Sequence, residues 1–208
     1  MDAFVINGRN QLRGEITVNG SKNAALPLMA ATLLANGPVT LRAVPRLADI
    51  ANMQRLLGEL GMEVSQSEVS DLQPRELTFT TLDHDASHAR YDIVRTMRAS
   101  ISVLGPLVAR RGYGRVSMPG GCAIGDRPVD LHLRGLAALG ADITLDSGDI
   151  TARAPVGRDG RARLRGARIF LGGPFGSTVL GTANVMSAAV LAEGQTVIES
   201  AACEPEIV

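Results

Sequence analysis

The chain has 208 residues, of which 45% are hydrophobic, and its 21 basic and 21 acidic side chains give a formal net charge of zero. This length and apolar content are typical of a globular protein that buries a sizeable core. The balanced charge, the lack of any run of more than two Lys or Arg, and an aromatic content of only 3% argue against a nucleic-acid-binding protein.

The first residues show no basic segment followed by an apolar run, so we expect no signal peptide. The longest apolar stretch, residues 24–35, is far too short to cross a bilayer, and we expect a cytoplasmic protein without membrane contact. Cys122 and Cys203 lie far apart and show no CxxC or Cys/His spacing, which predicts neither a disulfide nor a metal site. All three histidines are expected at the solvated surface: His84, His88 and His132.

Hydrophobic periodicity predicts a first unit of the order β-α-β-α-β-β. It has an apolar helix over 24–35 and an amphipathic helix over 47–60, which Gly61 closes. Its strands are predicted at 14–18, 39–42, 62–64 and 76–80, the last two as a hairpin.

The same unit then recurs twice. The second copy has predicted helices at 99–109 and 129–139, the latter closed by Gly140, and predicted strands at 114–118, 142–145 and 150–153. After a polar linker, the third copy has a strand at 167–171, an apolar helix at 179–192 and a strand at 196–199. It stops after residues 204–208, EPEIV, which are typical of the first turn of its second amphipathic helix. The helix-start signals at residues 20, 98 and 176 are 78 residues apart.

This repeat predicts an α/β fold in which three β-α-β-α-β-β units form one compact three-fold domain, with the third unit truncated. The units are expected at about 14–82, 92–154 and 167–208. We interpret the chain as a fragment of a longer protein.

The basic residues suggest an anion site. The chain has twenty Arg and a single Lys, Lys22, which points to a site that needs a compact ammonium rather than a planar guanidinium. Lys22, Arg98 and Arg127 each stand at or just before a predicted helix start, where free N–H groups and the helix dipole favour phosphates. Residues 176–178 offer the same backbone geometry with hydroxyl groups. The alternative is that the arginines are surface charges and that 19–23 is only a capping turn.

The stretch 118–132, MPGGCAIGDRPVDLH, places Cys122 among glycines and five residues before Arg127. Such a loop can move, bind an anion and carry thiol chemistry. We expect Arg127 and the following helix start to lower the pKa of the Cys122 thiol, which could then act as a general acid or a nucleophile. Asp126 and Asp130 either accept hydrogen bonds from a base or sugar or cap the helix. The alternative is a plain glycine-rich surface turn.

Four segments in this order resemble the UDP-N-acetylglucosamine 1-carboxyvinyltransferases, a family of enolpyruvyl transferases of peptidoglycan synthesis. The segments are GSKNAALP at 20–27, TMRAS at 96–100, PGGCAIGDRPVDLH at 119–132 and EPEIV at 204–208. The resemblance extends along the whole chain and covers about the N-terminal half of that family's sequence.

The resemblance implies the inside-out α/β fold of enolpyruvyl transferases. It also implies transfer of the enolpyruvyl group from phosphoenolpyruvate to the 3′-hydroxyl of UDP-N-acetylglucosamine by addition and elimination, without metal or cofactor. A cytoplasmic role in cell-wall biogenesis, cell shape and cell division follows, together with sensitivity to fosfomycin.

The resemblance also assigns roles to residues. Lys22 and Asn23 would contact phosphoenolpyruvate and the sugar region, Arg98 would hold the nucleotide sugar, and Cys122 would donate a proton to the enol carbon. The remaining substrate-binding positions that it implies are Arg127, Pro128, Val129, Asp130, Leu131, Ser177, Thr178 and Val179.

The sequence departs from the family pattern at 176–182, where a Lys or Pro usually precedes Ser-Val-Gly-Ala-Thr, and at Cys203, where the residue is usually basic. The family's second domain, which supplies a catalytic aspartate and further arginines, is expected outside this chain. Residues 1–20 are then a strand segment of that missing domain, residues 21–208 are the nucleotide-sugar domain, and the fragment is inactive alone. The alternatives are the shikimate-pathway enolpyruvyl transferase, against which the loop thiol and RPVDLH argue, and a non-catalytic remnant that binds UDP-sugar.

Overall fold

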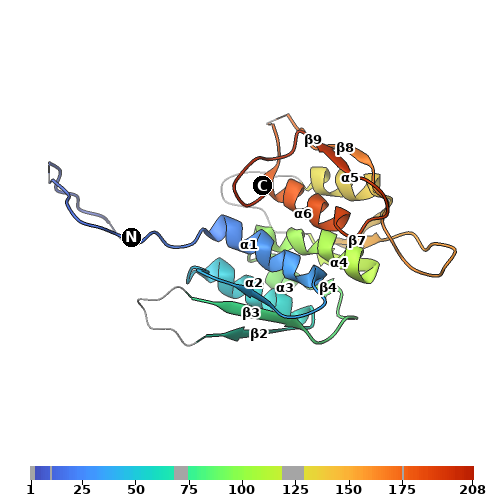
Figure 1. The fold of residues 1–208 in the computed structure, drawn as a ribbon, viewed down its shortest axis with the longest axis horizontal. Coiled ribbons are helices and arrows are strands. Elements are labelled where there is room, and N and C mark those ends of the chain that lie inside the picture. The colour runs from blue at the N-terminus through green and yellow to red at the C-terminus, as the bar shows by residue number, and fades with distance from the viewer. Residues whose placement is uncertain (1–2, 10, 68–74, 119–128, 175) are drawn as a thin grey trace.

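The computed structural model describes residues 3–9, 11–67, 75–118, 129–174 and 176–208 (Figure 1). Three sheets follow one another along the chain, and helices lie between them. The first part contains α1 (Lys22–Ala31), η1 (Thr32–Leu34), β1 (Val39–Leu41), α2 (Ala48–Glu59), β2 (Met62–Gln66) and β3 (Leu77–Thr81). The second contains β4 (His88–Ala89), α3 (Tyr91–Val94), η2 (Arg98–Val103), α4 (Leu104–Arg111), β5 (Tyr113–Ser117), α5 (Asp130–Ala138), β6 (Asp142–Asp146) and β7 (Asp149–Arg153). The third contains β8 (Arg168–Phe170), α6 (Val179–Ala189) and β9 (Val197–Glu199).

The sheets repeat one pattern. β1, β3 and β2 form an antiparallel sheet in that order, and the second sheet has the order β4-β5-β7-β6. The two predicted hairpins are confirmed, with Val64 opposite Phe79 in the first and Leu145 opposite Ile150 in the second. The strand before each later apolar helix runs parallel to the strand after it, since β4 pairs with β5 and β8 pairs with β9 in parallel.

The apolar helices lie at the centre of the molecule and the sheets lie outside them. α1 packs against η2 and α6, and α4 packs against α6 (Figure 1). Met29, Leu104 and Val185, one from each of the three apolar helices, are fully buried there. Because each of these helices is apolar on most of its surface, it needs neighbours on several sides, and three equivalent helices provide them for one another. The predicted α/β class with helices inside is therefore confirmed.

The amphipathic helices α2 and α5 end in the same way. Gly61 and Gly140 follow them with φ of +79° and +90°, a conformation that side chains with a Cβ rarely adopt. At Gly61 the space is also closed, because a Cβ would come within 2.4 Å of the Asp83 carbonyl oxygen. The spacing of 79 residues between these glycines thus marks two equivalent helix ends.

The predicted helix at 99–109 is split into η2, a 3₁₀-helix, and α4. The hydroxyl of Ser100 donates to the Met97 carbonyl at 2.6 Å, and the hydroxyl of Ser102 donates to the Ala99 carbonyl. Serine hydroxyls that bond to the backbone three residues earlier compete with the α-helical pattern. The 3₁₀ turns therefore occupy the segment that contains the two serines, and the regular α-helix begins at Leu104.

The predicted strand at 14–18 is wrong for this chain. Residues 3–9 and 11–20 form no strand, and Figure 1 shows them as a blue arm that leaves α1. Ile16 and Val18 are 91% and 85% exposed. A strand satisfies its N–H and C=O groups through a neighbouring strand. No described strand pairs with residues 14–18. Whether residues 1–20 belong to a second domain stays a prediction.

Among the described residues, no helix combines the length and apolarity that a bilayer crossing requires.

Candidate functional site

The start of α1 places the single lysine beside a carboxylate. Ser21 is the N-cap, and its Oγ accepts a hydrogen bond from the Ala24 N–H at 3.3 Å, which fixes where the helix begins. Lys22 follows as the first helical residue, and its Nζ lies 2.8 Å from Asp49 Oδ2 in the first turn of α2. Asn23 is exposed at the same helix end.

The start of α6 is fixed by a second hydroxyl cap. Thr178 Oγ1 accepts a hydrogen bond from the Gly181 N–H at 3.2 Å, and Val179 begins the helix. Thr182 Oγ1 donates to the Thr178 carbonyl at 2.7 Å and accepts from the Ala202 N–H at 3.1 Å. The start of α6 is thereby tied to the segment that follows β9, while Ser177 stays exposed.

The start of α5 lies next to the start of α6. Val129 is the N-cap residue of α5, and Asp130 is exposed in its first turn. Leu131 extends toward the loop before α6, because a Cβ on Gly173 would come within 3.2 Å of Leu131 Cδ1. Residues 129–131 and 177–179, which the sequence predicts to bind the nucleotide, therefore lie at neighbouring helix ends.

One buried amide joins α6 to three other helical elements, η2, α4 and α5. Asn184 in α6 is 1% exposed, and its Oδ1 accepts from the Gly105 N–H at 2.7 Å. This contact fixes the orientation of the amide, so Asn184 Nδ2 is the donor. Nδ2 lies 3.2 Å from the Ile101 carbonyl oxygen and 3.0 Å from His132 Nδ1. Gly105 makes the approach possible, because a Cβ there would meet the Asn184 carbonyl oxygen at 2.2 Å.

His132 is buried and neutral, so the expectation that it lies at the solvated surface is wrong. Its side chain is 3% exposed, because it is on the face of α5 that packs against α6. Burial, followed by the positive charge of Arg98, lowers the pKa of His132 to about 4, although Asp130 acts in the opposite direction. Since Nδ1 accepts from Asn184, the proton of the neutral ring is on Nε2.

Arg98 is the first residue of η2, and its charge acts on His132 in α5. The structure thus places Arg98 near the beginning of α5 and Leu131 beside the loop that leads into α6, while Asn184 joins the middle of α6 to η2 and α5. Lys22 is at the start of α1, which packs against η2. The predicted residues Cys122, Arg127 and Pro128 lie outside the described residues.

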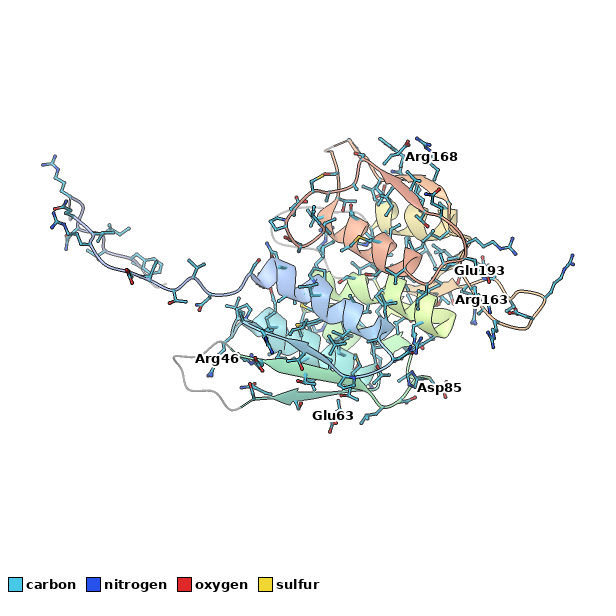
Figure 2. The ribbon with its side chains drawn as sticks, viewed as in Figure 1. Arg46, Glu63, Asp85, Arg163, Arg168 and Glu193 are labelled. Carbon is cyan, nitrogen blue, oxygen red and sulfur yellow. The ribbon has the colours of Figure 1, made fainter. Side chains whose placement is uncertain are left out.

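The described part of the chain also forms cavities. Three cavities formed by described residues have volumes of 280, 310 and 460 Å³, and none of these three is lined by a predicted site residue. Two of them share Arg161 and Arg163 in their walls. Figure 2 shows Arg163 beside Glu193 at the end of the molecule opposite Arg46, which precedes α2 and hence Asp49. Two of these three cavities therefore lie away from the helix starts, whereas the third is lined by Arg46, Leu47 and Ala48 at the start of α2. The helix starts remain the candidate site because their cations and N–H groups suit phosphates.

Among the described residues, no three His, Cys, Asp or Glu side chains are grouped so that they could hold a metal ion. Sequence reasoning missed Asp49 and Asn184, which act across separations of 27 and 52 to 83 residues. The one signal for Asn184 is a polar amide within an otherwise apolar helix.

Known proteins resemble this chain along most of its length. A profile of the EPSP synthase (3-phosphoshikimate 1-carboxyvinyltransferase) family matches residues 6–208. A UDP-N-acetylglucosamine 1-carboxyvinyltransferase from Methylacidiphilum infernorum (isolate V4) is 50% identical over 207 residues, which cover 100% of this chain and 46% of that relative.

Two solved structures share the fold at 18% sequence identity. The enolpyruvyl transferase NikO from Streptomyces tendae has a TM-score of 0.75 and is matched over 96% of this chain and 43% of its own. An EPSP synthase from Acinetobacter baumannii has a TM-score of 0.65, with 93% of this chain and 42% of its own covered. The chain spans about half the length of the relatives that it matches.

Proposed function

The chain belongs to the EPSP synthase family, and on that premise we propose that it is the nucleotide-sugar half of a UDP-N-acetylglucosamine 1-carboxyvinyltransferase. The observation that carries the proposal is the 50% identity, along the whole chain, to a relative with that name. Two observations support it: the charge of Arg98 at the start of η2 acts on the beginning of α5, and Leu131 lies beside the loop that leads into α6. A diphosphate needs several cations and N–H groups at one place.

The proposed reaction transfers the enolpyruvyl group of phosphoenolpyruvate to the 3′-hydroxyl of UDP-N-acetylglucosamine. In the addition step, the 3′-hydroxyl gives its proton to a base, for which the resemblance implies an aspartate of the second domain, and its oxygen bonds to C-2 of phosphoenolpyruvate while Cys122 gives a proton to C-3. In the elimination step, C-3 returns a proton to a base of the site and the bond from C-2 to the phosphate oxygen breaks, which restores the double bond and releases phosphate. No metal or cofactor takes part, and the charge of the phosphates is met by cationic side chains and helix N-termini.

The residues take the roles that the sequence resemblance implies. Lys22 and Asn23 bind phosphoenolpyruvate and the sugar region, and Arg98 binds the nucleotide sugar. Residues 127–131 grip the phosphates and the uridine, and residues 177–179 add N–H and hydroxyl donors. In support, Thr178 holds the start of α6 through its own hydroxyl, and Leu131 lies beside the loop that leads to it.

The rest of the site would come from a second domain that this chain does not contain. The exposed arm at residues 3–9 and 11–19, with apolar side chains such as Phe4 at 98% exposure, would belong to a strand of that domain, and residues 21–208 would be the nucleotide-sugar domain. The isolated chain is then expected to bind nucleotide sugar without turnover. In the cell, the complete enzyme would act in the cytoplasm, in peptidoglycan synthesis, and so in cell shape and division.

Calorimetric titration tests this proposal against the shikimate-pathway alternative. UDP-N-acetylglucosamine and shikimate 3-phosphate are titrated separately into the chain, and we expect heat of binding with the nucleotide sugar. Binding of shikimate 3-phosphate alone would overturn the proposal, and so would binding of neither compound. Turnover by the isolated chain would contradict its incompleteness. The remnant hypothesis gains support if the nucleotide sugar binds but the wild type shows no turnover when a second domain is supplied. In that case Cys122→Asp, which carries an alternative proton donor, should be equally inert.

Fosfomycin gives a chemical test at the thiol. We expect this epoxide to alkylate Cys122 faster than Cys203 when UDP-N-acetylglucosamine is present. Cys203 is an internal control, because it is exposed and its Sγ donates to the Ala201 carbonyl oxygen, at 3.7 Å. Peptide mass spectrometry that finds equal labelling of the two thiols would count against an organised site.

A further inference from the structure

The ion pair between Lys22 and Asp49 joins the beginnings of two helices. Lys22 is the first residue of α1, Asp49 is in the first turn of α2, and α1 packs against α2. The Nζ to Oδ2 distance is 2.8 Å, and the two side chains are 41% and 35% exposed. The pair therefore remains open to solvent and to a ligand.

Asp49 is the better-anchored member of the pair. A carboxylate in the first turn of a helix is stabilised by the positive end of the helix dipole. The N-cap residue Leu47 makes no side-chain hydrogen bond to the helix start, so it does not take over this role from Asp49. Lys22, by contrast, has a long stem with many rotamers and a point-like charge. The carboxylate thus restricts the position of the ammonium, rather than the reverse.

The pair is not explained by stability. An exposed ion pair contributes little to folding, because solvent screens it and two side chains lose rotamer freedom. A carboxylate next to an anion site also repels the anion. Fixing the position of the lysine charge would offset this repulsion, because one ammonium N–H is directed to Asp49 and an ammonium has two further donors that suit a phosphate or carboxylate.

We propose that Asp49 is a positioning residue that holds the Lys22 ammonium at the start of α1, ready for the anionic enolpyruvyl donor. This inference rests on the proposed function, which makes Lys22 a substrate-binding residue. Asp49 acts through Lys22 and does not itself contact the reacting atoms.

The chain offers a direct readout, because it contains a single lysine. Protein labelled with ¹³C and ¹⁵N in lysine alone gives one Cε–Nζ signal, which reports the order of the Lys22 ammonium. We expect this signal to be ordered in the wild type, to relax like a mobile side chain in Asp49→Asn, and to regain order in Asp49→Glu. Asp92→Asn is the matched control, since Asp92 is an exposed acid in the first turn of α3.

Titration with phosphoenolpyruvate completes the test. We expect a saturable shift of the Lys22 signal in the wild type, and an apparent Kd about threefold to tenfold higher in Asp49→Asn, because the lysine then loses its rotamer freedom on binding instead of beforehand. Equal or tighter binding by Asp49→Asn would overturn the positioning role alone. The absence of any shift in the wild type would overturn the proposed function at this residue, whatever the order of the ammonium. Urea unfolding of each variant confirms that the fold is intact.

Discussion

The buried His132 predicts how stability depends on pH. Burial lowers its pKa from 6.5 to about 4, so between these values the unfolded chain binds a proton that the folded chain does not. The free energy of unfolding therefore rises with pH through this window, and the contribution is complete above about pH 6.5 and lost progressively toward about pH 4. At roughly 1.4 kcal/mol per pH unit, stability at pH 4.5 should be about 2.5 kcal/mol lower than at pH 8.

The structure explains the size of this penalty. Protonation would make both ring nitrogens donors, and Nδ1 would then face the Nδ2 donor of Asn184 at 3.0 Å. Arg98 adds a second positive charge nearby. The pKa values of Asp149 and Asp159 are lowered from 3.8 by hydrogen bonds and by nearby arginines, so these groups lose most of their contribution below that pH and add little between pH 8 and pH 4.5.

Urea unfolding at intervals from pH 8 to pH 4.5 measures the effect. His132→Gln keeps an acceptor for Asn184 but cannot titrate, so its stability should lack the His132 component. His84→Gln is the control, because His84 is exposed and the same substitution there should leave the wild-type pH dependence in place. If the curves of the wild type and His132→Gln run parallel within about 0.5 kcal/mol, the linkage argument is refuted.

Three further substitutions test the packing that positions the site, each by urea unfolding. Asn184→Leu should cost about 3 kcal/mol, because it leaves buried backbone and ring partners unsatisfied, and a loss below about 1 kcal/mol would contradict the network. Gly105→Ala should lower the free energy of unfolding by about 1–3 kcal/mol, because the added methyl group clashes with α6. Gly58→Ala, in open space on α2, should raise it by about 0.5–1 kcal/mol. Equal effects would count against the close approach of Gly105 to Asn184. Arg111→Met removes the donors to three carbonyl groups of residues that precede the second unit. Its loss of unfolding free energy should be about 2 kcal/mol larger than that of Arg110→Met, so similar losses would contradict this link between the units.

The sequence predicts the repeat well because its signals are local. Apolar periodicity and a closing glycine mark α2 and α5, and alternating strands mark the hairpins β2–β3 and β6–β7. The two-residue strand β4 was missed because it is too short to show any alternation. The strand at 14–18 has the right residues and no partner, which a local pattern does not reveal.

The site was predicted in part. The residues at the helix starts, such as Thr178, carry capping and glycine signals that place them correctly at the beginnings of helices. The contacts between helices depend on which faces pack, so the burial of His132 and the partnership of Lys22 with Asp49 emerge only in three dimensions. The roles of Cys122 and Arg127 remain predictions, because both lie outside the described residues.

The central claim is that UDP-N-acetylglucosamine binds at the converging helix starts. The most direct measurement is a map of backbone amide shifts in the ¹⁵N-labelled chain during titration with this nucleotide sugar. We predict the largest shifts at Arg98, Leu131 and Thr178, and little change in the sheet β1-β3-β2. Shifts confined to the arginine-lined cavities around Arg163, or no shifts at saturating ligand, would contradict the claim.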